Sequence, residues 1–321
     1  MSEALEKPFK NRITDIFDLN PISDSRFRSI CLKNVRQVHP ALAYGGHIFT
    51  QALTAAENTV AEDLIPHSAH CYFLNYAKVS EPVEYHIVKI RDGKSFSTRR
   101  VEASQNGTPI LTLTVSFHKE ENGKMIHQEK IPRVPLPESL LEMRQIVPNI
   151  LKAVEDGHLE INKTFQSRLF DYDQRVFYTN SADDIFEIKP TSFQNYYGLT
   201  DLKEPKMYFW LKTKEKICDD LKVHRYLLSF IADSYPGVAV LTPHNCNNFK
   251  ETMLFTIDHS VWFHSNDFRA DDWILFEVSS KIAGGGRTLA EGKMFTRDGR
   301  LIMTCQQEIL IRSKGDFVSK L

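Results

Sequence analysis

A long helix with one apolar face is predicted near the start of the chain. From Tyr44 to Asp63, apolar residues recur every three or four positions, so they gather on one side of a helix that begins beside Gly45-Gly46. Alternating apolar and polar residues then predict four strands: Cys71–Tyr76, Val83–Ile90, Ser95–Ala103 and Ile110–Phe117. Asn106-Gly107 tolerates the positive φ angles of a tight hairpin and predicts the turn between the last two strands.

The second half of the chain repeats this order. A helix is predicted over Lys222–Ala232, and Asp298-Gly299 marks a matching hairpin turn. The strands predicted after the helix are Leu254–Phe263, Trp273–Val278, Thr288–Phe295 and Leu301–Ile311. Sliding one half over the other pairs Phe73 with Phe263, Val83 with Trp273, Gly107 with Gly299, and Leu111 with Met303. The repeat predicts an α+β fold of two helix-wrapped antiparallel sheets that join edge to edge into one continuous sheet.

This repeat divides the chain into two lobes and a connection. We expect an N-terminal lobe over residues 1–120, a linker over 121–165 and a C-terminal lobe over 166–318. The linker is charged, contains Pro132, Pro135 and Pro137, and carries a predicted helix over Glu138–Val154. Its charges are more typical of a solvated surface than of a binding tail.

Composition excludes several classes of protein. The 40 basic and 41 acidic residues of the 321-residue chain give a formal charge of -1, so no global field attracts nucleic acid. The five cysteines are widely spaced without a C-x-x-C pair, which favours reduced thiols over disulfides or metal ligands. Neither a secretory h-region nor an apolar run of about 20 residues is present, so we expect an intracellular protein without a membrane span.

The chain ends in Ser319-Lys320-Leu321, the tripeptide that a peroxisomal import receptor reads at a free C-terminus. Such a short signal also arises by chance, in which case these residues are only a polar tail. The tripeptide over 319–321 therefore predicts the peroxisomal matrix while leaving that alternative open.

Three polar residues interrupt apolar patterns in the second half. When the final strands of the two halves are aligned, Gln307 takes the position that Val115 has in the first half, on a face that is otherwise apolar. Asp233 closes the apolar helical run, and Thr256 alternates into the strand from Leu254. A buried amide without a partner costs about 1–3 kcal/mol, so a polar pocket would account for Gln307. Asp233 could equally end a helix before Pro236-Gly237, and Thr and Gln are common in strands.

Several longer motifs resemble the type II, TesB-like acyl-CoA thioesterases. They are YGGHIFTQAL (44–53), HSAHCYFL (67–74), RDGKSFSTRRV (91–101), TIDHSVWFH (256–264) and DGRLIMTCQQE (298–308). The resemblance covers about Pro21 to Arg312, and the terminal tripeptide points to the family's peroxisomal branch. It implies a double-hotdog fold and hydrolysis of fatty acyl-CoA, with CoA as part of the substrate and no cofactor.

The resemblance also implies the site residues. The family's catalytic Asp, Ser or Thr, and Gln carry over to Asp233, Thr256 and Gln307. Ser234-Tyr235-Pro236-Gly237 departs from the family pattern and puts the direction of the Asp233 carboxylate in question. Further departures are His47 and Thr50 in the first helix, which predict a changed acyl channel, and Ile309, which replaces a usual Gly.

The expected chemistry is attack by a water molecule that Asp233, Thr256 and Gln307 orient, without a covalent intermediate. Gly93-Lys94-Ser95-Phe96-Ser97 lacks the second glycine of a nucleophile elbow. The other candidate groups have ordinary structural roles: His67, His70, His259 and His264 as core or strand histidines, and Arg99 and Arg100 as charges on a solvent face. An enoyl-CoA hydratase and a non-catalytic acyl-CoA-binding protein remain as alternatives, and homo-oligomers are plausible.

Overall fold

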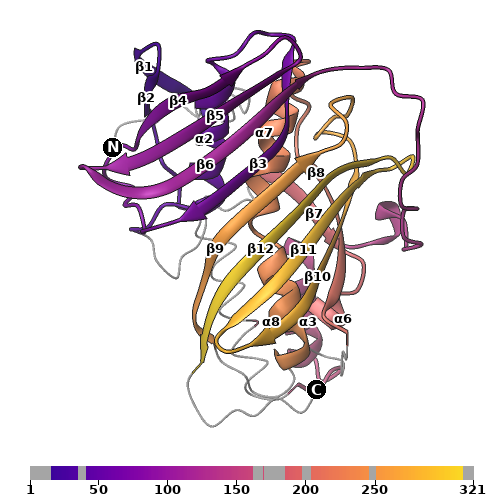
Figure 1. Ribbon diagram of the computed structural model, residues 1–321. Helices are drawn as coiled ribbons and strands as arrows, with labels where there is room; N and C mark the ends of the chain where they lie inside the picture. The colour runs from indigo at the N-terminus through magenta and orange to yellow at the C-terminus, as the bar shows by residue number, and fades with distance from the viewer. Residues whose placement is uncertain are drawn as a thin grey trace, which may run out of the picture.

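A computed structural model describes residues 16–34, 41–161, 169, 185–196, 204–245 and 251–313 (Figure 1). All strands in these ranges belong to one antiparallel sheet of twelve strands. Its order is β1-β2-β4-β5-β6-β3-β9-β12-β11-β10-β8-β7, so strands of the first half fill one side and strands of the second half the other. The halves meet where β3 pairs with β9. This is the α+β double-hotdog arrangement that the repeat and the resemblance predict.

The first half contains six of the strands and one long helix. The elements are β1 (Leu19–Ser23), β2 (Arg26–Ser29), α2 (Gly45–Glu57), β3 (Leu64–Phe73), β4 (Glu84–Asp92), β5 (Phe96–Gln105) and β6 (Thr108–Lys119). The predicted hairpin turn is confirmed, because Asn106 and Gly107 have φ angles of 51° and 78°. The strand predicted over Cys71–Tyr76 is wrong in its bounds, since β3 begins at Leu64, where Pro66 and Ser68 obscure the alternation.

The second half repeats the same series. Its elements are β7 (Phe186–Pro190), α6 (Phe193–Tyr196), β8 (Lys206–Thr213), α7 (Leu221–Ala232), α8 (Pro236–Asn245), β9 (Glu251–Phe263), β10 (Ile274–Gly284), β11 (Arg287–Thr296) and β12 (Leu301–Ser313). The register confirms the repeat, because Phe73 pairs with Leu111 in the first half and Phe263 pairs with Met303 in the second. The pattern missed the edge strands β1 and β7 and their neighbours β2 and β8.

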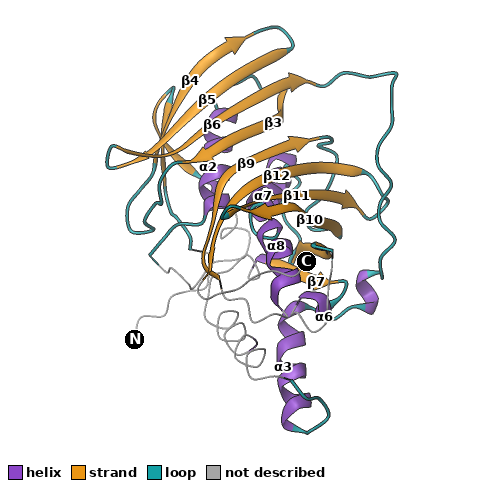
Figure 2. Ribbon diagram, turned by 60° about the horizontal axis from the view of Figure 1, so that its bottom comes forward, coloured by secondary structure: helices purple, strands orange, loops and turns teal. Residues whose placement is uncertain are grey.

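The central helices α2 and α7 lie side by side against one face of the sheet (Figure 2). Their contact is close because a β-carbon on Gly46 would lie 2.5 Å from the Phe230 carbonyl oxygen. Nearly all of α2 is buried, since α7 covers the side that the sheet leaves uncovered. It ends at Glu57, six residues before the predicted end at Asp63.

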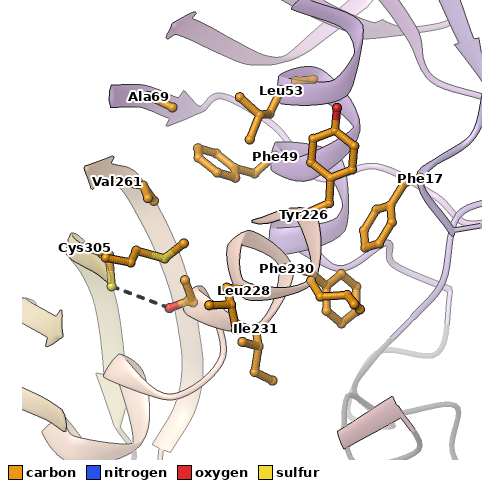
Figure 3. Close-up of a cluster of buried hydrophobic side chains, with 14 of the residues drawn as sticks. Phe17, Phe49, Leu53, Ala69, Tyr226, Leu228, Phe230, Ile231, Val261 and Cys305 are labelled. Carbon is orange, nitrogen blue, oxygen red and sulfur yellow. Dashed lines mark hydrogen bonds between the residues drawn. The ribbon is translucent and has the colours of Figure 1, made fainter. Parts of the chain in front are cut away.

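The apolar core fills the space between the two central helices and the sheet (Figure 3). Phe49 and Leu53 of α2 and Tyr226 and Phe230 of α7 are all at most 6% exposed. The inward residues of the sheet that meet them include Ala69 and Val261, which belong to the two strands joining the lobes. One core therefore spans both halves, and it fixes the end of α7 relative to the start of α2.

The connection between the halves packs against the second lobe. The Trp210 indole donates to the Pro135 carbonyl over 2.9 Å, and Gln128 donates to the Gly299 carbonyl over 2.6 Å. The predicted helix over Glu138–Val154 is a short 3-10 turn, η1 (Pro137–Ser139), followed by α3 (Met143–Glu155). The lobe boundaries over 1–120, 121–165 and 166–318 stay predictions.

Candidate active site

Asp233 lies at the junction of two consecutive helices. It caps the C-terminus of α7 with helical backbone angles, and α8 begins three residues later at Pro236. Proline suits the first position of a helix because its φ is already helical and the missing N–H has no intrahelical acceptor there. Pro236-Gly237 thus starts α8. Gly237 faces the strands, where a β-carbon would lie 3.4 Å from Leu254.

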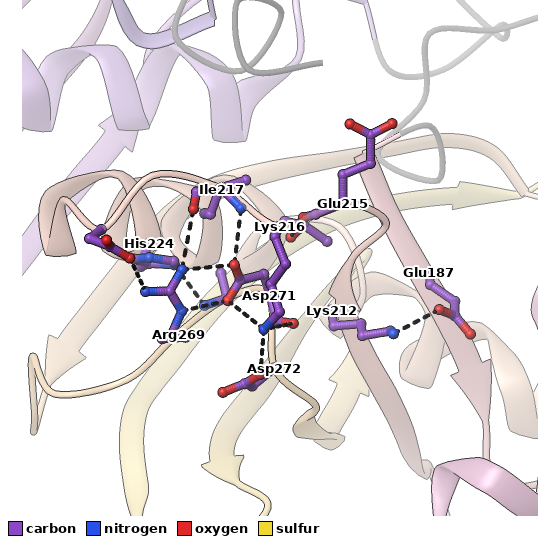
Figure 4. A network of polar contacts seen from close by, with 12 residues as sticks. Glu187, Lys212, Glu215, Lys216, Ile217, His224, Arg269, Asp271 and Asp272 are labelled. Atoms are coloured by element: carbon purple, nitrogen blue, oxygen red, sulfur yellow. Dashed lines mark hydrogen bonds and ion pairs between the residues drawn. The ribbon is translucent and has the colours of Figure 1, made fainter. Parts of the chain in front are cut away.

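The start of α7 is fixed by a polar network (Figure 4). Asp220 caps the helix by accepting from the Lys222 N–H, while His224 accepts from the Ala270 N–H and contacts the Cys218 carbonyl at 3.0 Å. Asp271 binds Arg269 and the Ile217 N–H, and these donors hold the pKa of that carboxyl well below its usual range despite burial, which acts in the opposite direction. A helix fixed at its start places the residue at its end reproducibly.

The three predicted site residues meet at one carboxylate oxygen. Thr256 of β9 donates from Oγ1 to Asp233 Oδ1 over 2.9 Å, and Gln307 of β12 donates from Nε2 to the same oxygen over 2.6 Å. Asp233 is 8% exposed and Gln307 fully buried, whereas Thr256 is half-buried. The sheet register explains the meeting, because Thr256 pairs with Ile309, two positions from Gln307 on the adjacent strand.

The second carboxylate oxygen faces the N-terminus of α2. A β-carbon on Gly45 would lie 3.0 Å from Asp233 Oδ2, so only glycine permits this approach without displacement. Tyr44, which precedes the helix, donates to the Phe230 carbonyl over 2.8 Å and thereby ties the start of α2 to the end of α7. A helix N-terminus carries partial positive charge, which favours an anion at this position.

His259 is a core strand histidine, as predicted, but sequence reasoning missed that it lies beside the candidate site. It is fully buried, it pairs with Gln307 across β9 and β12, and its ring meets Phe49 edge-on at 4.9 Å. Burial lowers its pKa to about 4, although the Asp233 carboxylate and the Gln306 backbone oppose the shift. The internal repeat could have revealed this position, since the pair that corresponds to His259 and Gln307 in the first lobe is the apolar pair Ala69 and Val115.

Two thiols border the site and are held in the protonated state. Burial, followed by the nearby Asp233 carboxylate, raises the pKa values of Cys71 and Cys305 above their usual range. A thiol must ionise before it attacks a thioester, so these cysteines are poor nucleophiles.

Other candidate groups have structural partners. Arg99 is 2% exposed and binds Asp92 and Thr59, so its predicted place on a solvent face is wrong; it lies inward on β5. His47 and Thr50 form hydrogen bonds to backbone groups, His47 with Ile16 and Lys33 and Thr50 with Gly46. Within the described ranges, no group of three or more His, Cys, Asp or Glu side chains is arranged to hold a metal ion.

Comparison with known proteins assigns the chain to a family. A family profile described as acyl-CoA thioesterase matches residues 177–310, and one described as acyl-CoA thioesterase N-terminal domain matches residues 36–118. The mouse protein named acyl-coenzyme A thioesterase 8 is 35% identical over 304 residues, which cover 94% of this chain and 89% of the mouse protein. The chain belongs to the type II acyl-CoA thioesterases. The resemblance identified from the motifs is confirmed.

Other members of the family support the same assignment. The yeast protein named peroxisomal acyl-coenzyme A thioester hydrolase 1, from Saccharomyces cerevisiae, is 22% identical over 365 residues, covering 99% of each chain. The crystal structure of acyl-CoA thioesterase II TesB2 from Mycobacterium marinum aligns with a TM-score of 0.71 at 27% identity, covering 95% of this chain and all of the other. The terminal tripeptide 319–321 lies outside the described residues. None of the helices in the described ranges is long and apolar enough for a bilayer span.

Proposed function

We propose that this protein hydrolyses fatty acyl-CoA thioesters to a free fatty acid and CoA by direct attack of water, with Asp233, Thr256 and Gln307 as the catalytic residues. The observation that carries the proposal is the sharing of one carboxylate oxygen by two donors. Thr256 and Gln307 both donate to Asp233 Oδ1, which fixes the carboxylate and leaves Oδ2 directed toward Gly45. A general base needs such a free, oriented oxygen.

The attacking water would bind at Asp233 Oδ2, which takes its proton as the oxygen adds to the thioester carbonyl carbon. Thr256 donates its only hydrogen to Asp233, so its oxygen is free to accept a hydrogen bond from the same water. The charge that develops on the carbonyl oxygen would be stabilised by the N–H groups of Gly45 and Gly46 at the start of α2. Tyr44, which forms the N-cap, provides no side-chain cap for these groups.

The leaving group needs little help. CoA departs as a thiolate whose acidity resembles that of cysteine, with a pKa of about 8.5, so its departure does not require a strong general acid. The proton that Asp233 takes from the water can then pass to the CoA thiolate. The proposed reaction uses water and acyl-CoA alone, without a cofactor.

A single-turnover experiment in water labelled with oxygen-18 tests direct attack. Enzyme in excess over a long-chain acyl-CoA should produce fatty acid that carries one labelled oxygen, while Asp233 stays unlabelled. Attack by the Asp233 carboxylate itself would form an anhydride and, when water opens it at Asp233, would leave the label on the protein; unlabelled fatty acid in the first turnover contradicts the proposal. The same mass spectra separate free acid from the hydroxyacyl-CoA that a hydratase would produce, and binding without either product would indicate an acyl-CoA-binding protein.

The proposed location is the peroxisomal matrix, with Ser319-Lys320-Leu321 bound by the import receptor. The name of the yeast relative supports this location. The full chain fused behind a fluorescent protein should co-localise with a peroxisomal marker, and removal of Leu321 should leave it diffuse. Unchanged co-localisation after removal of Leu321 would show that the tripeptide is not the address.

A further inference from the structure

By hydrogen-bond geometry, three buried polar atoms next to Asp233 have no partner among the described residues, although the Gln306 backbone lies near enough to His259 to raise its pKa. They are both ring nitrogens of His259 and the side-chain oxygen Oε1 of Gln307. Both residues are 0% exposed, so bulk solvent does not reach them. Each unpaired group costs about 1–3 kcal/mol, and buried polar groups in proteins are nearly always paired with protein or with ordered water.

The three atoms belong to two neighbouring side chains. His259 and Gln307 are directly opposite on β9 and β12, and side chains of such pairs leave the sheet on the same face with β-carbons about 4.5–5.5 Å apart. On the other side of His259, β3 presents Cys71 as its partner, and the Phe49 ring covers it from α2. Asp233 lies near enough for its charge to act on His259. The His259–Gln307 pair is thus bordered by a thiol, an aromatic ring and the Asp233 carboxylate.

The fold does not require polar residues here. In the first lobe the corresponding positions hold Ala69 and Val115, which pair in the same way on β3 and β6 and are both fully buried. Only the lobe that carries Asp233 replaces this apolar pair by a histidine and an amide. A buried water typically makes about three hydrogen bonds to groups of this kind.

The protonation state of His259 fits one bridging molecule. With a pKa of about 4 the ring is neutral at physiological pH, so it has one N–H donor and one bare nitrogen acceptor. Gln307 Oε1 only accepts. A water that accepts from the imidazole N–H and donates to Oε1 pairs two of the three atoms at once.

We propose that His259 and Gln307 Oε1 hold an internal water molecule next to Asp233, and that His259 acts through it as a positioning residue for the Gln307 amide. If the amide turned over, its oxygen would face the Asp233 carboxylate and the 2.6 Å hydrogen bond from Nε2 would be lost. A donor at Oε1 keeps the amide in the productive orientation. The catalytic consequence rests on the proposed function; the water site does not.

A crystal structure at about 1.5 Å resolution tests the water site without any assay. The parent protein should show an ordered water within hydrogen-bond distance of His259 and Gln307 Oε1, and His259→Leu should lack it. A dry contact, or a direct hydrogen bond from the imidazole to Oε1, would overturn the proposal.

Kinetics test the positioning role. His259→Leu should lower kcat at least tenfold with KM within about threefold of the parent, and His259→Gln, which keeps a donor and an acceptor, should recover most of kcat. The matched control is Arg99→Leu, which removes a similarly buried polar side chain of the first lobe whose partners are Asp92 and Thr59; it should lower the unfolding midpoint but leave kcat within about twofold. Unchanged kcat in His259→Leu, or equal losses in His259→Leu and His259→Gln, would refute the role. A parent that releases no CoA would instead contradict the proposed function, and the crystal structure would still decide the water site.

Discussion

A buried ion pair joins the central helices of the two lobes, and breaking it should destabilise the whole protein. Arg225 of α7 donates from Nη2 to Glu57 Oε1 of α2 over 2.5 Å, with the two side chains 3% and 4% exposed. The Tyr226 hydroxyl donates to the other carboxylate oxygen over 2.9 Å. These contacts hold together the two helices whose ends form the candidate site.

The perturbation is Arg225→Met, which keeps most of the apolar stem and removes the charge. Glu57 would then be buried without its main partner, and breaking a buried pair in this way costs about 3–5 kcal/mol. The Tyr226 hydroxyl would still donate, and the Lys222 ammonium, 3.9 Å from Glu57, would compensate part of the loss. We therefore expect a loss of about 3 kcal/mol in the free energy of unfolding.

Urea unfolding followed by circular dichroism measures this loss. With a slope of about 3 kcal/mol per molar, the midpoint should fall by about 1 M. The control is Arg297→Met, because Arg297 contacts Glu138 at 2.6 Å with both side chains about half exposed, and an exposed pair of this kind contributes at most about 1 kcal/mol. An Arg225→Met variant within about 1 kcal/mol of the parent would refute the reasoning. The double variant Glu57→Met/Arg225→Met should recover much of the loss, since no buried charge remains.

Two further changes test the packing and the electrostatics. Gly46→Ala should separate α2 from α7, because its β-carbon would lie 2.5 Å from the Phe230 carbonyl; we expect kcat to fall at least tenfold, whereas Gly284→Ala, where no atom lies within 4 Å, should keep it. Equal kcat values in the two variants would contradict the close helix contact. Burial lowers the pKa of His47 from 6.5 to about 4, so its contribution to stability is complete above pH 6.5 and is lost as the pH falls toward 4. From pH 7 to 5 this amounts to about 2 kcal/mol, and His47→Gln should remove that share of the pH dependence of unfolding, while an unchanged dependence would show that His47 titrates normally.

The internal repeat made most of the fold predictable. Long segments with clear periodicity, such as α7 and β9, were found close to their observed bounds because one side of each is buried. The edge strands β1 and β7 escaped, since each is only five residues long. Short edge strands have too few positions to reveal an alternation.

Residues of the candidate site could be predicted where the two halves of the repeat differ and where the family motifs are specific. Gln307 could be singled out because the first lobe has Val115 at that place, and the structure brings it to Asp233 together with Thr256. The direction of the Asp233 carboxylate was not predictable, because a proline at position 236 is compatible both with the end of one helix and with the start of another. The burial of Arg99 was missed for a similar reason, since charged residues on strands usually face solvent and its partner Thr59 lies 40 residues away.

The central claim is that the Asp233 carboxylate activates the attacking water. Release of free CoA from a long-chain acyl-CoA, followed with a thiol reagent, tests it in Asp233→Asn, which keeps the size of the side chain and removes its basicity. The account predicts a fall in kcat of about 10²–10⁴, the range typical of general base catalysis, while Asp258→Asn, whose carboxylate accepts from the Glu308 N–H, stays close to the parent. An Asp233→Asn activity within about tenfold of the parent, a change of only ~1.4 kcal/mol in the barrier, would contradict the account.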